Sequence, residues 1–337
     1  MLRKIILFGL CICSLPLLGR EFPLCMYGVS NPADLPLLKQ AGFTCVQSYQ
    51  STPEKLAALA RAAQKEGLKI VFYPNKILGT SYEKEAKNWP VLAWYLVDEP
   101  DVHRWSRERV LEAHQKAKKA FKNHPTALVI GQGKTAVPFY DLPDIMMMDW
   151  YPVPHLPLTS FGDNVRYTKE GLAKTNMQDH PLWGVVQIFD WKNYEQYRSD
   201  DDRIGRLPTE DEIRFMSYDG IFNGATGLFF FTFNHLKKPL PQSAPAFWAY
   251  VTSVTKELAQ LRPVFENNKQ VANPVEVQDP LQMITYEYKK HKYSILINRS
   301  NVAQTVPAEL LRRKYKAQFN RQKAAQIPPY GVWVLKY

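Results

Sequence analysis

The chain has 337 residues, which suits one large domain of roughly 250 residues and a small second module. Hydrophobic residues make up 45% and charged residues 22%, the composition of an ordinary globular protein. Lys and Arg exceed Asp and Glu by 11. These basic residues are scattered in short runs rather than gathered in one patch, which argues against a nucleic-acid partner and favours a general attraction to anionic polymers or cell envelopes.

The N-terminus has the pattern of a secretory signal peptide. Arg3 and Lys4 form a positive end, and residues 5–18 form an apolar run. That run is too short to span a membrane comfortably, and no other segment is apolar enough to do so. We therefore expect residues 1–20 to be removed, the mature protein to be secreted or periplasmic, and the chain to have no stable membrane span.

Cleavage there would leave two of the four cysteines. Cys11 and Cys13 lie in the expected signal peptide, whereas Cys25 and Cys45 lie on predicted core strands. Two buried free thiols are the interpretation we favour. One disulfide between neighbouring strands is the alternative in an oxidising compartment.

Short apolar runs alternate with helical patterns from Phe22 onward. The runs cover residues 22–29, 43–49, 69–75, 91–99, 126–132, 145–151, 182–190 and 227–234, and the last helix covers 244–261. This alternation predicts an α/β fold, a (β/α)8 TIM barrel over residues 21–262. An open, doubly wound sheet would need a glycine-rich phosphate loop, and no such motif occurs.

The helical period is lost near Pro263. Residues 283–288, 293–298 and 331–335 have the pattern of β-strands, with turns between them. We expect residues 263–337 to form a small antiparallel, β-sandwich-like domain packed on the barrel.

Polar and aromatic residues gather where the predicted strands end, and a barrel brings all of these ends to one face. The candidate substrate-binding residues are Tyr49, Tyr73, Asn75, Asp98, Trp150, Tyr151, Gln187, Asp190 and Asn234, with Gln132 at a further strand end. Trp94, Phe189 and Trp191 are further candidates for stacking on a sugar ring. We expect about half of the aromatic candidates to pack in the core or in loops instead.

The sharpest signal is the segment 94–100, an apolar strand that ends in Asp98, Glu99 and Pro100. Glu99 would lie in the barrel mouth among apolar neighbours, which raise a carboxyl pKa as a general acid requires. The alternative is a polar strand-to-helix loop with a capping acid.

This segment resembles the clan of retaining (β/α)8-barrel glycosidases that includes cellulases and β-galactosidases. The resemblance implies that Glu99, at the end of strand four, is the acid/base. Asp98 replaces the asparagine that binds the sugar 2-hydroxyl in that clan. The segment 149–152, Gln187 and the segment 206–212 add a looser similarity to exported glycosidase-like barrel proteins.

One departure concerns the nucleophile, which in that clan is a glutamate at the end of strand seven. Gln187 lies near that position and cannot act as a nucleophile. Asp149 on strand six and Asp190 beyond strand seven remain, and we expect Asp149 to be the second carboxylate. A purely structural hydrogen bond is the alternative role for Asp149.

Other chemistries lack their motifs: the histidines show no metal-binding spacing and the serines no G-x-S-x-G turn. Neither a metal nor a cofactor is expected, and no signal fixes an oligomeric state. The leading hypothesis is a glycoside hydrolase that acts on an extracellular or envelope oligo- or polysaccharide. A carbohydrate-binding barrel without catalysis is the alternative, and a polysaccharide lyase or another barrel enzyme is a third.

Overall fold

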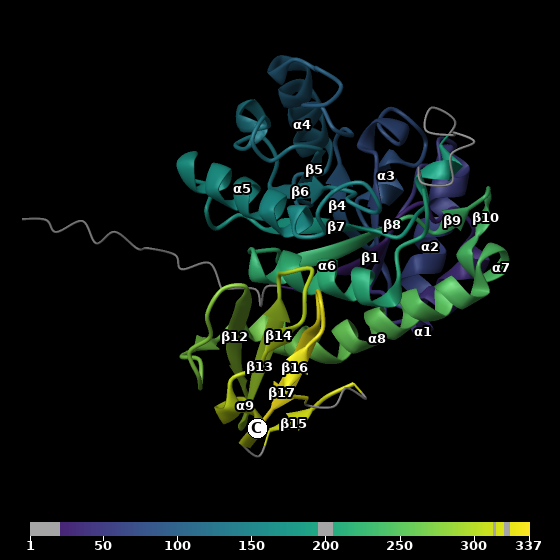
Figure 1. Cartoon of the computed structure of the whole chain (residues 1–337). Coiled ribbons are helices and arrows are strands. Elements are labelled where there is room, and N and C mark those ends of the chain that lie inside the picture. Colours follow the sequence, from purple (N-terminus) through teal and green to yellow (C-terminus); the bar gives the residue numbers. More distant parts are fainter. Residues whose placement is uncertain (1–20, 195–204, 313–314, 320–323) are drawn as a thin grey trace, which may run out of the picture.

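The computed structural model describes residues 21–194, 205–312, 315–319 and 324–337. Eight parallel strands form a closed barrel in sequence order, with each strand paired to the next and β8 paired to β1 (Figure 1). The strands are β1 (Leu24–Met26), β2 (Cys45–Gln47), β3 (Lys69–Phe72), β4 (Val91–Tyr95), β5 (Thr126–Ile130), β6 (Ile145–Asp149), β7 (Leu182–Gln187) and β8 (Gly227–Phe231). The predicted TIM barrel is confirmed.

The hydrogen-bonded strands are shorter than the apolar runs that predicted them. The run over 91–99, for example, becomes β4 (Val91–Tyr95), and residues 96–99 form the loop above the barrel. Side chains of β4 alternate between two cores, because successive residues of a strand point to opposite faces. Ala93 and Tyr95 face the barrel interior, whereas Trp94 packs outward against Phe121 with ring centroids 4.3 Å apart.

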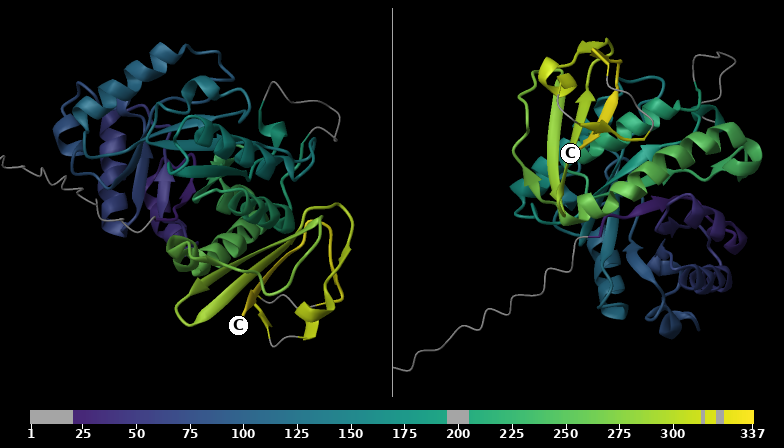
Figure 2. Two further views of the ribbon diagram at one scale, coloured as in Figure 1. Left: turned by 90° about the vertical axis from the view of Figure 1, so that its left-hand side faces the viewer. Right: turned by 90° about the horizontal axis from the view of Figure 1, so that it is seen from below.

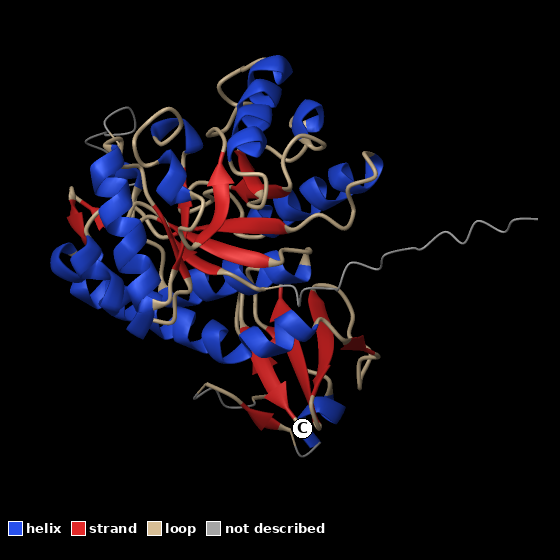
Figure 3. Ribbon diagram, turned by 180° about the vertical axis from the view of Figure 1, so that it is seen from behind, coloured by secondary structure: helices blue, strands red, loops and turns tan. Residues whose placement is uncertain are grey.

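Helices surround the barrel strands (Figure 3). They are α1 (Leu35–Gln40), α2 (Pro53–Glu66), α3 (Glu83–Ala86), α4 (Arg107–Ala120), α5 (Ser160–Lys174), α6 (Glu210–Phe222), α7 (Leu240–Ser243) and α8 (Pro245–Asn267). Gly67 ends α2 in the left-handed conformation that glycine adopts without steric cost. The connection from β5 to β6 contains only the 3-10 turn η3 (Val137–Phe139) among its described residues.

The last barrel helix is longer than the sequence predicted. It continues through Pro263 to Asn267 rather than ending near Leu261. Proline removes one backbone hydrogen bond from a helix. Burial offsets this loss, because the Phe265 ring lies 5.0 Å from Phe22 in the barrel and 5.8 Å from Tyr286 in the C-terminal sheet.

The C-terminal residues form an antiparallel β-module beside α6 and α8 (Figures 1 and 2). Its main sheet has the order β11 (Gln270–Val271), β12 (Leu281–Tyr288), β13 (His291–Asn298), β17 (Val332–Lys336) and β15 (Lys316–Ala317). A second, two-stranded sheet pairs β14 (Gln304–Thr305) with β16 (Gln326–Ile327), and α9 (Ala308–Arg312) follows β14 in the chain. The predicted antiparallel module is confirmed.

Two arginines join the barrel to this module. Arg214 on α6 is buried, pairs with Glu257 on α8 at 2.8 Å and donates to the Val332 carbonyl of β17 at 2.6 Å. Arg299, which follows β13, pairs with the fully buried Asp219 of α6 at 2.8 Å. Burial raises the pKa of Asp219 to about 7, and the charge of Arg299 opposes that rise.

Cys25 of β1 and Cys45 of β2 lie opposite each other in the barrel interior and form a disulfide. The favoured interpretation of two free thiols was therefore wrong, and the alternative of one bond between neighbouring strands is correct. Adjacent strands place these Cα atoms 4.5 Å apart, within bridging distance. Residues 1–20, the expected signal peptide, lie outside the described residues. Within the described ranges, no helix is both long and apolar enough to cross a membrane.

Candidate active site

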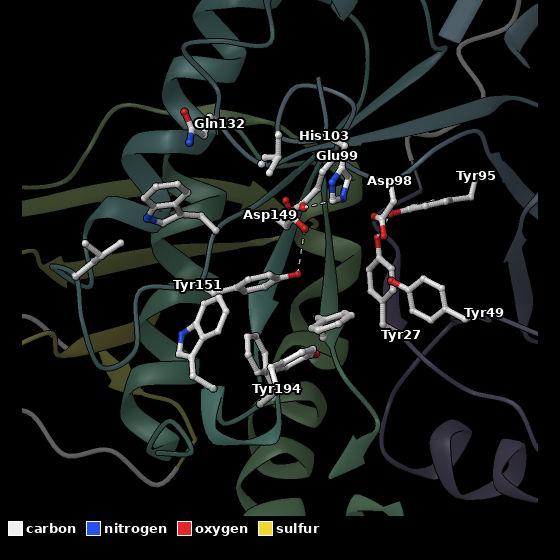
Figure 4. A pocket seen from close by; sticks show the side chains of 17 residues that line it. Tyr27, Tyr49, Tyr95, Asp98, Glu99, His103, Gln132, Asp149, Tyr151 and Tyr194 are labelled. Atoms are coloured by element: carbon white, nitrogen blue, oxygen red, sulfur yellow. Dashed lines mark hydrogen bonds and ion pairs between the residues drawn. The ribbon is translucent and has the colours of Figure 1, made fainter. Parts of the chain in front are cut away.

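A cavity of about 500 Å3 opens at the carboxyl ends of the barrel strands. Residues from the ends of β1, β2, β4, β5, β6, β7 and β8 line it, so nearly the whole barrel contributes. The lining consists of Tyr27, Tyr49, Tyr95, Asp98, Glu99, Val102, His103, Gly131, Gln132, Asp149, Trp150, Tyr151, Leu156, Phe189, Trp191, Tyr194 and Phe231 (Figure 4). Three carboxyl groups thus lie in a mainly aromatic cavity.

Glu99 and Asp149 bring their carboxyl groups together in this cavity. Asp149 ends β6 and Glu99 lies in the loop after β4, yet both carboxyls line the cavity, where each influences the acidity of the other. Tyr151 donates its hydroxyl to Oδ2 of Asp149 at 3.2 Å, while Oδ1 is buried and accepts no hydrogen bond from the described groups. Two buried carboxyls in one site disfavour double ionisation, so one of them keeps its proton to higher pH than an isolated carboxyl would.

Burial is the main cause of the unusual acidity of this pair. It raises the pKa of Asp149 far above that of an ordinary aspartate, and the charge of Glu99 raises it further. Burial also raises the pKa of Glu99, although the contact with Asp149 lowers it. Both carboxyls therefore keep their protons to higher pH than exposed carboxyls do, with Asp149 the more strongly affected of the two.

The loop after β4 fixes the position of Glu99. Its backbone has a φ of 40°, in the left-handed region that glutamate rarely adopts, and its carbonyl accepts hydrogen bonds from the amides of Val102 and His103. Asp101 holds the loop to the end of β5, because its carboxylate accepts from the amides of Gly131 and Gln132 at 3.1 and 2.8 Å. The backbone hydrogen bonds of this loop and the contacts of Asp101 thus fix the position of Glu99.

Gly131 leaves the space that the Glu99 carboxyl occupies. A Cβ atom there would lie 2.5 Å from Cγ2 of Val102 and 3.2 Å from Oε1 of Glu99. His103 lies on the other side of Glu99, with 3.9 Å between Nε2 and Oε2. No side chain larger than that of glycine therefore fits beside Glu99 without a shift.

Several residues predicted from sequence do line the cavity. They are Tyr49, Asp98, Glu99, Gln132, Asp149, Trp150, Tyr151, Phe189 and Trp191. Trp150 uses its indole nitrogen to donate to Ser160 at 2.9 Å, which fixes its ring. Tyr73 and Asn75 instead line a neighbouring hollow, which shares Asp98 and His103 with the main cavity.

Gln187, Asp190 and Asn234 do not line the cavity, and each is held by the backbone. Gln187 is fully buried and exchanges two 2.8 Å hydrogen bonds with the backbone of Val153. Asp190 caps the turn η4 (Trp191–Asn193) by accepting from the Lys192 amide, and Asn234 donates to the Gly28 carbonyl. None of the three therefore lines the cavity as expected. The Gln187 amide uses both of its polar atoms on the Val153 backbone, and the contacts of Asp190 and Asn234 use one polar atom each.

Trp94 is a further correction. It faces away from the cavity and is buried against Phe121, so it is no sugar platform. In the segment 206–212, the Arg206 guanidinium makes two 2.6 Å hydrogen bonds to Glu212 and clamps the loop before α6. Thr209 and Glu212 form a capping box at the start of α6.

Sequence reasoning missed the deeper aromatic lining. Tyr27, Tyr95, Tyr194 and Phe231 line the cavity, as does His103. The strand alternation was an available signal, because Tyr95 must face inward wherever Trp94 faces outward. Across the described residues, no group of three or more His, Cys, Asp or Glu side chains is placed to hold a metal ion.

No protein-family model and no curated protein sequence matches the chain. Solved structures are similar over nearly its whole length. A glycoside hydrolase family 5 protein from Bacteroides vulgatus has a TM-score of 0.58 at 13% identity, covering 93% of this chain and 88% of that one. A GH30 endoxylanase from Clostridium papyrosolvens has a TM-score of 0.54 at 12% identity, covering 94% and 96%.

An alpha-amylase from Anoxybacillus has a TM-score of 0.54 at 11% identity, covering 94% of this chain and 98% of that one. At such low identities, the likeness concerns the fold. The chain therefore has the (β/α)8-barrel fold that these barrel glycoside hydrolases share, extended by a C-terminal β-module.

Proposed function

We propose that this protein is a glycoside hydrolase in which Glu99 and Asp149 are the two catalytic carboxyls. The observation that carries the proposal is that both carboxyls line one aromatic cavity at the barrel mouth. Barrel enzymes hold their active sites at this end, and glycoside hydrolysis uses two carboxyls, one protonated and one ionised. The solved structures of similar fold include an endoxylanase and an alpha-amylase, which is consistent with a carbohydrate substrate.

Glu99 is the proton donor to the leaving oxygen in this proposal. Its side chain is 27% exposed, whereas Asp149 is only 7% exposed, so Glu99 lies nearer the solvent side from which a leaving group departs. We infer that Asp149 passes a proton to its neighbour Glu99 before the leaving oxygen is protonated, which leaves Asp149 ionised. Asp149 then faces the sugar carbon as the second carboxylate, oriented by the Tyr151 hydroxyl.

The two carboxyls are close enough to shift each other's pKa. Carboxyl groups lie about 5 Å apart in retaining glycosidases and about 6.5–9.5 Å apart in inverting ones. We infer that a bound glycoside sets the working separation by turning the Glu99 side chain toward the mouth. If this does not occur, the second candidate function applies, a carbohydrate-binding barrel without catalysis. The absence of a carboxyl at Gln187 favours that candidate too.

Turnover of a substrate panel distinguishes the two functions. Aryl glycosides and polysaccharides of several sugars would be incubated with the protein, and reducing ends or released phenol would be measured. We expect hydrolysis of at least one class. Binding measured by calorimetry on the same panel without any turnover would support the binding barrel instead.

We also propose that the protein is exported. The apolar run behind Arg3 and Lys4 has the length of a signal peptide. The Cys25–Cys45 disulfide is consistent with an oxidising compartment, since such bonds are rare in the cytosol. N-terminal sequencing of the protein from its native host should begin near residue 20, whereas an intact Met1 would contradict export.

A further inference from the structure

Asp98 lies against a ring of four tyrosines at one side of the cavity. Tyr27, Tyr49, Tyr73 and Tyr95 come from the ends of four successive strands. Neighbouring ring centroids are 6.1 Å apart for Tyr27 and Tyr49, 6.1 Å for Tyr49 and Tyr73, 4.9 Å for Tyr73 and Tyr95, and 6.2 Å for Tyr95 and Tyr27. Figure 4 shows three of these rings grouped around Asp98, beside the catalytic pair. The tyrosines thus form a closed aromatic group with a carboxyl at its edge.

The carboxyl of Asp98 is held at one oxygen and open at the other. Tyr95 donates its hydroxyl to Oδ1 at 2.6 Å, and the Tyr95 hydroxyl lies 3.3 Å from that of Tyr27. In the part of the chain that the structure describes, Oδ2 accepts no hydrogen bond. Asp98 lines the cavity, so this oxygen is available to a ligand.

The described lining of the cavity is acidic although the chain has an excess of basic residues. Asp98, Glu99 and Asp149 belong to this lining, which includes no Lys or Arg and has His103 as its one basic side chain. Arg109 and Lys116 line the neighbouring hollow, where Glu112 pairs with Lys116 at 2.6 Å.

These features select against an anionic sugar. Along the described lining, a carboxylate on the ligand would meet three carboxyls and no guanidinium or ammonium group. A cation would gain twice, because a carboxylate attracts it directly and aromatic faces attract it through their quadrupoles. Asp149, buried with an unpaired Oδ1 atom, is a second acceptor in the same cavity.

We propose that the Asp98 side of the cavity binds a protonated amine, and that the substrate contains an amino sugar with a free amino group. The proposal rests on the glycosidase function above and names its substrate class. The ammonium group would donate a hydrogen bond to Oδ2 of Asp98 and lie against the group of four tyrosines. An acetylated amine would lose both the charge and a donor, and a hydroxyl would lose the charge.

Matched oligosaccharides test this inference. The tetramers of glucosamine, N-acetylglucosamine and glucose with β-1,4 linkages differ only in the group at C2, and free galactosamine and galactose form a pair that does not depend on linkage. Binding would be measured by titration calorimetry in the Glu99→Gln protein, which prevents turnover. We expect each amine to bind at least about tenfold more tightly than its hydroxyl counterpart, equivalent to about 1.4 kcal/mol.

Two further variants in the same Glu99→Gln background show whether Asp98 causes the preference for the amine. Asp98→Asn keeps the shape and removes the charge, so it should abolish most of the preference for the amine. Asp190→Asn is the matched control, since Asp190 caps a turn outside the cavity, and it should retain the preference. Retention of the preference in Asp98→Asn would overturn the assignment to Asp98.

The remaining outcomes separate this inference from the proposed function. Equal or tighter binding of the hydroxyl or acetamide sugars overturns the amine site and leaves the glycosidase proposal standing if aryl glycosides are cleaved. Binding of none of these sugars, by a wild-type protein that cleaves aryl glycosides, also overturns it. A protein that neither binds nor cleaves any glycan contradicts both proposals.

Discussion

Glu99 and Asp149 line the same cavity and shift each other's pKa, although one residue follows β4 and the other ends β6. Closure of the barrel brings these two strand ends to one mouth, and Asp101 holds the loop that carries Glu99 to the end of β5. Such a pair can supply the proton donor and the ionised partner that catalysis by two carboxyl groups requires.

The pH dependence of turnover should reflect the apparent pKa values of Glu99 and Asp149. Burial raises the pKa of both carboxyls, so each stays protonated to higher pH than an exposed carboxyl would. Below the lower of the two apparent pKa values both groups are protonated, and above the higher one neither is. We expect a bell-shaped profile of kcat/KM with both limbs at higher pH than exposed carboxyls would give. An acid limb within or below the range of ordinary exposed carboxyls would contradict a buried pair.

Gly131→Ala tests the fit beside Glu99. The new Cβ would meet Val102 at 2.5 Å and Glu99 at 3.2 Å, so the Glu99 carboxyl must move. A displacement of this kind typically reduces kcat by roughly 10- to 100-fold, with a smaller change in substrate binding. Steady-state kinetics on the best substrate would measure it. Wild-type kcat in a folded Gly131→Ala protein would show that the position of Glu99 is not critical.

Arg299→Leu should destabilise the junction between the barrel and the β-module. It leaves Asp219 buried without its partner, which typically costs about 3–5 kcal/mol of unfolding free energy. A carboxyl whose folded pKa is raised, here to about 7, stabilises the fold when protonated and loses that contribution as pH rises. The loss in Tm should therefore be larger at pH 8 than at pH 5.

Arg61→Leu is the control for that measurement. Arg61 pairs with Glu85 at 2.6 Å, but its side chain is 60% exposed and the pair is screened by solvent, so the substitution should leave Tm nearly unchanged. A similar Tm for the two variants, at both pH values, would show that Arg299 does not hold the module in place.

The disulfide gives a separate test. Peptide mapping without reductant should find Cys25 linked to Cys45, and reduction should lower the unfolding free energy by about 3 kcal/mol, as the closed loop of this length implies. Two alkylated thiols at these positions in unreduced, exported protein would contradict the bond and restore the interpretation of buried free cysteines.

The barrel was predictable because its signal is repeated. Eight apolar runs alternating with helical patterns allow few architectures, and strand ends such as Glu99 and Asp149 meet at one face in any closed barrel. The proximity of those two carboxyls was not predictable. It depends on the left-handed backbone of Glu99 and on the small volume of Gly131, which sequence spacing does not reveal.

The errors have physical causes as well. Gln187 is a polar strand-end residue, as expected, but a polar group in a buried position must form hydrogen bonds, and the Val153 backbone supplies them. Trp94 was chosen for its residue type, although its neighbour Tyr95 occupies the inward position of the strand. The disulfide depended on the register of β1 and β2, which the sequence left open.

Turnover by the Glu99→Gln and Asp149→Asn variants tests the central claim most directly. Each removes one carboxyl while keeping its shape, and Asp190→Asn is the control outside the cavity. We predict that both variants lose roughly 10²-fold or more of kcat on the best substrate of the panel and retain sugar binding, while the control keeps near wild-type activity. Wild-type turnover by both variants, or a severe loss only in Asp190→Asn, would contradict catalysis by this pair.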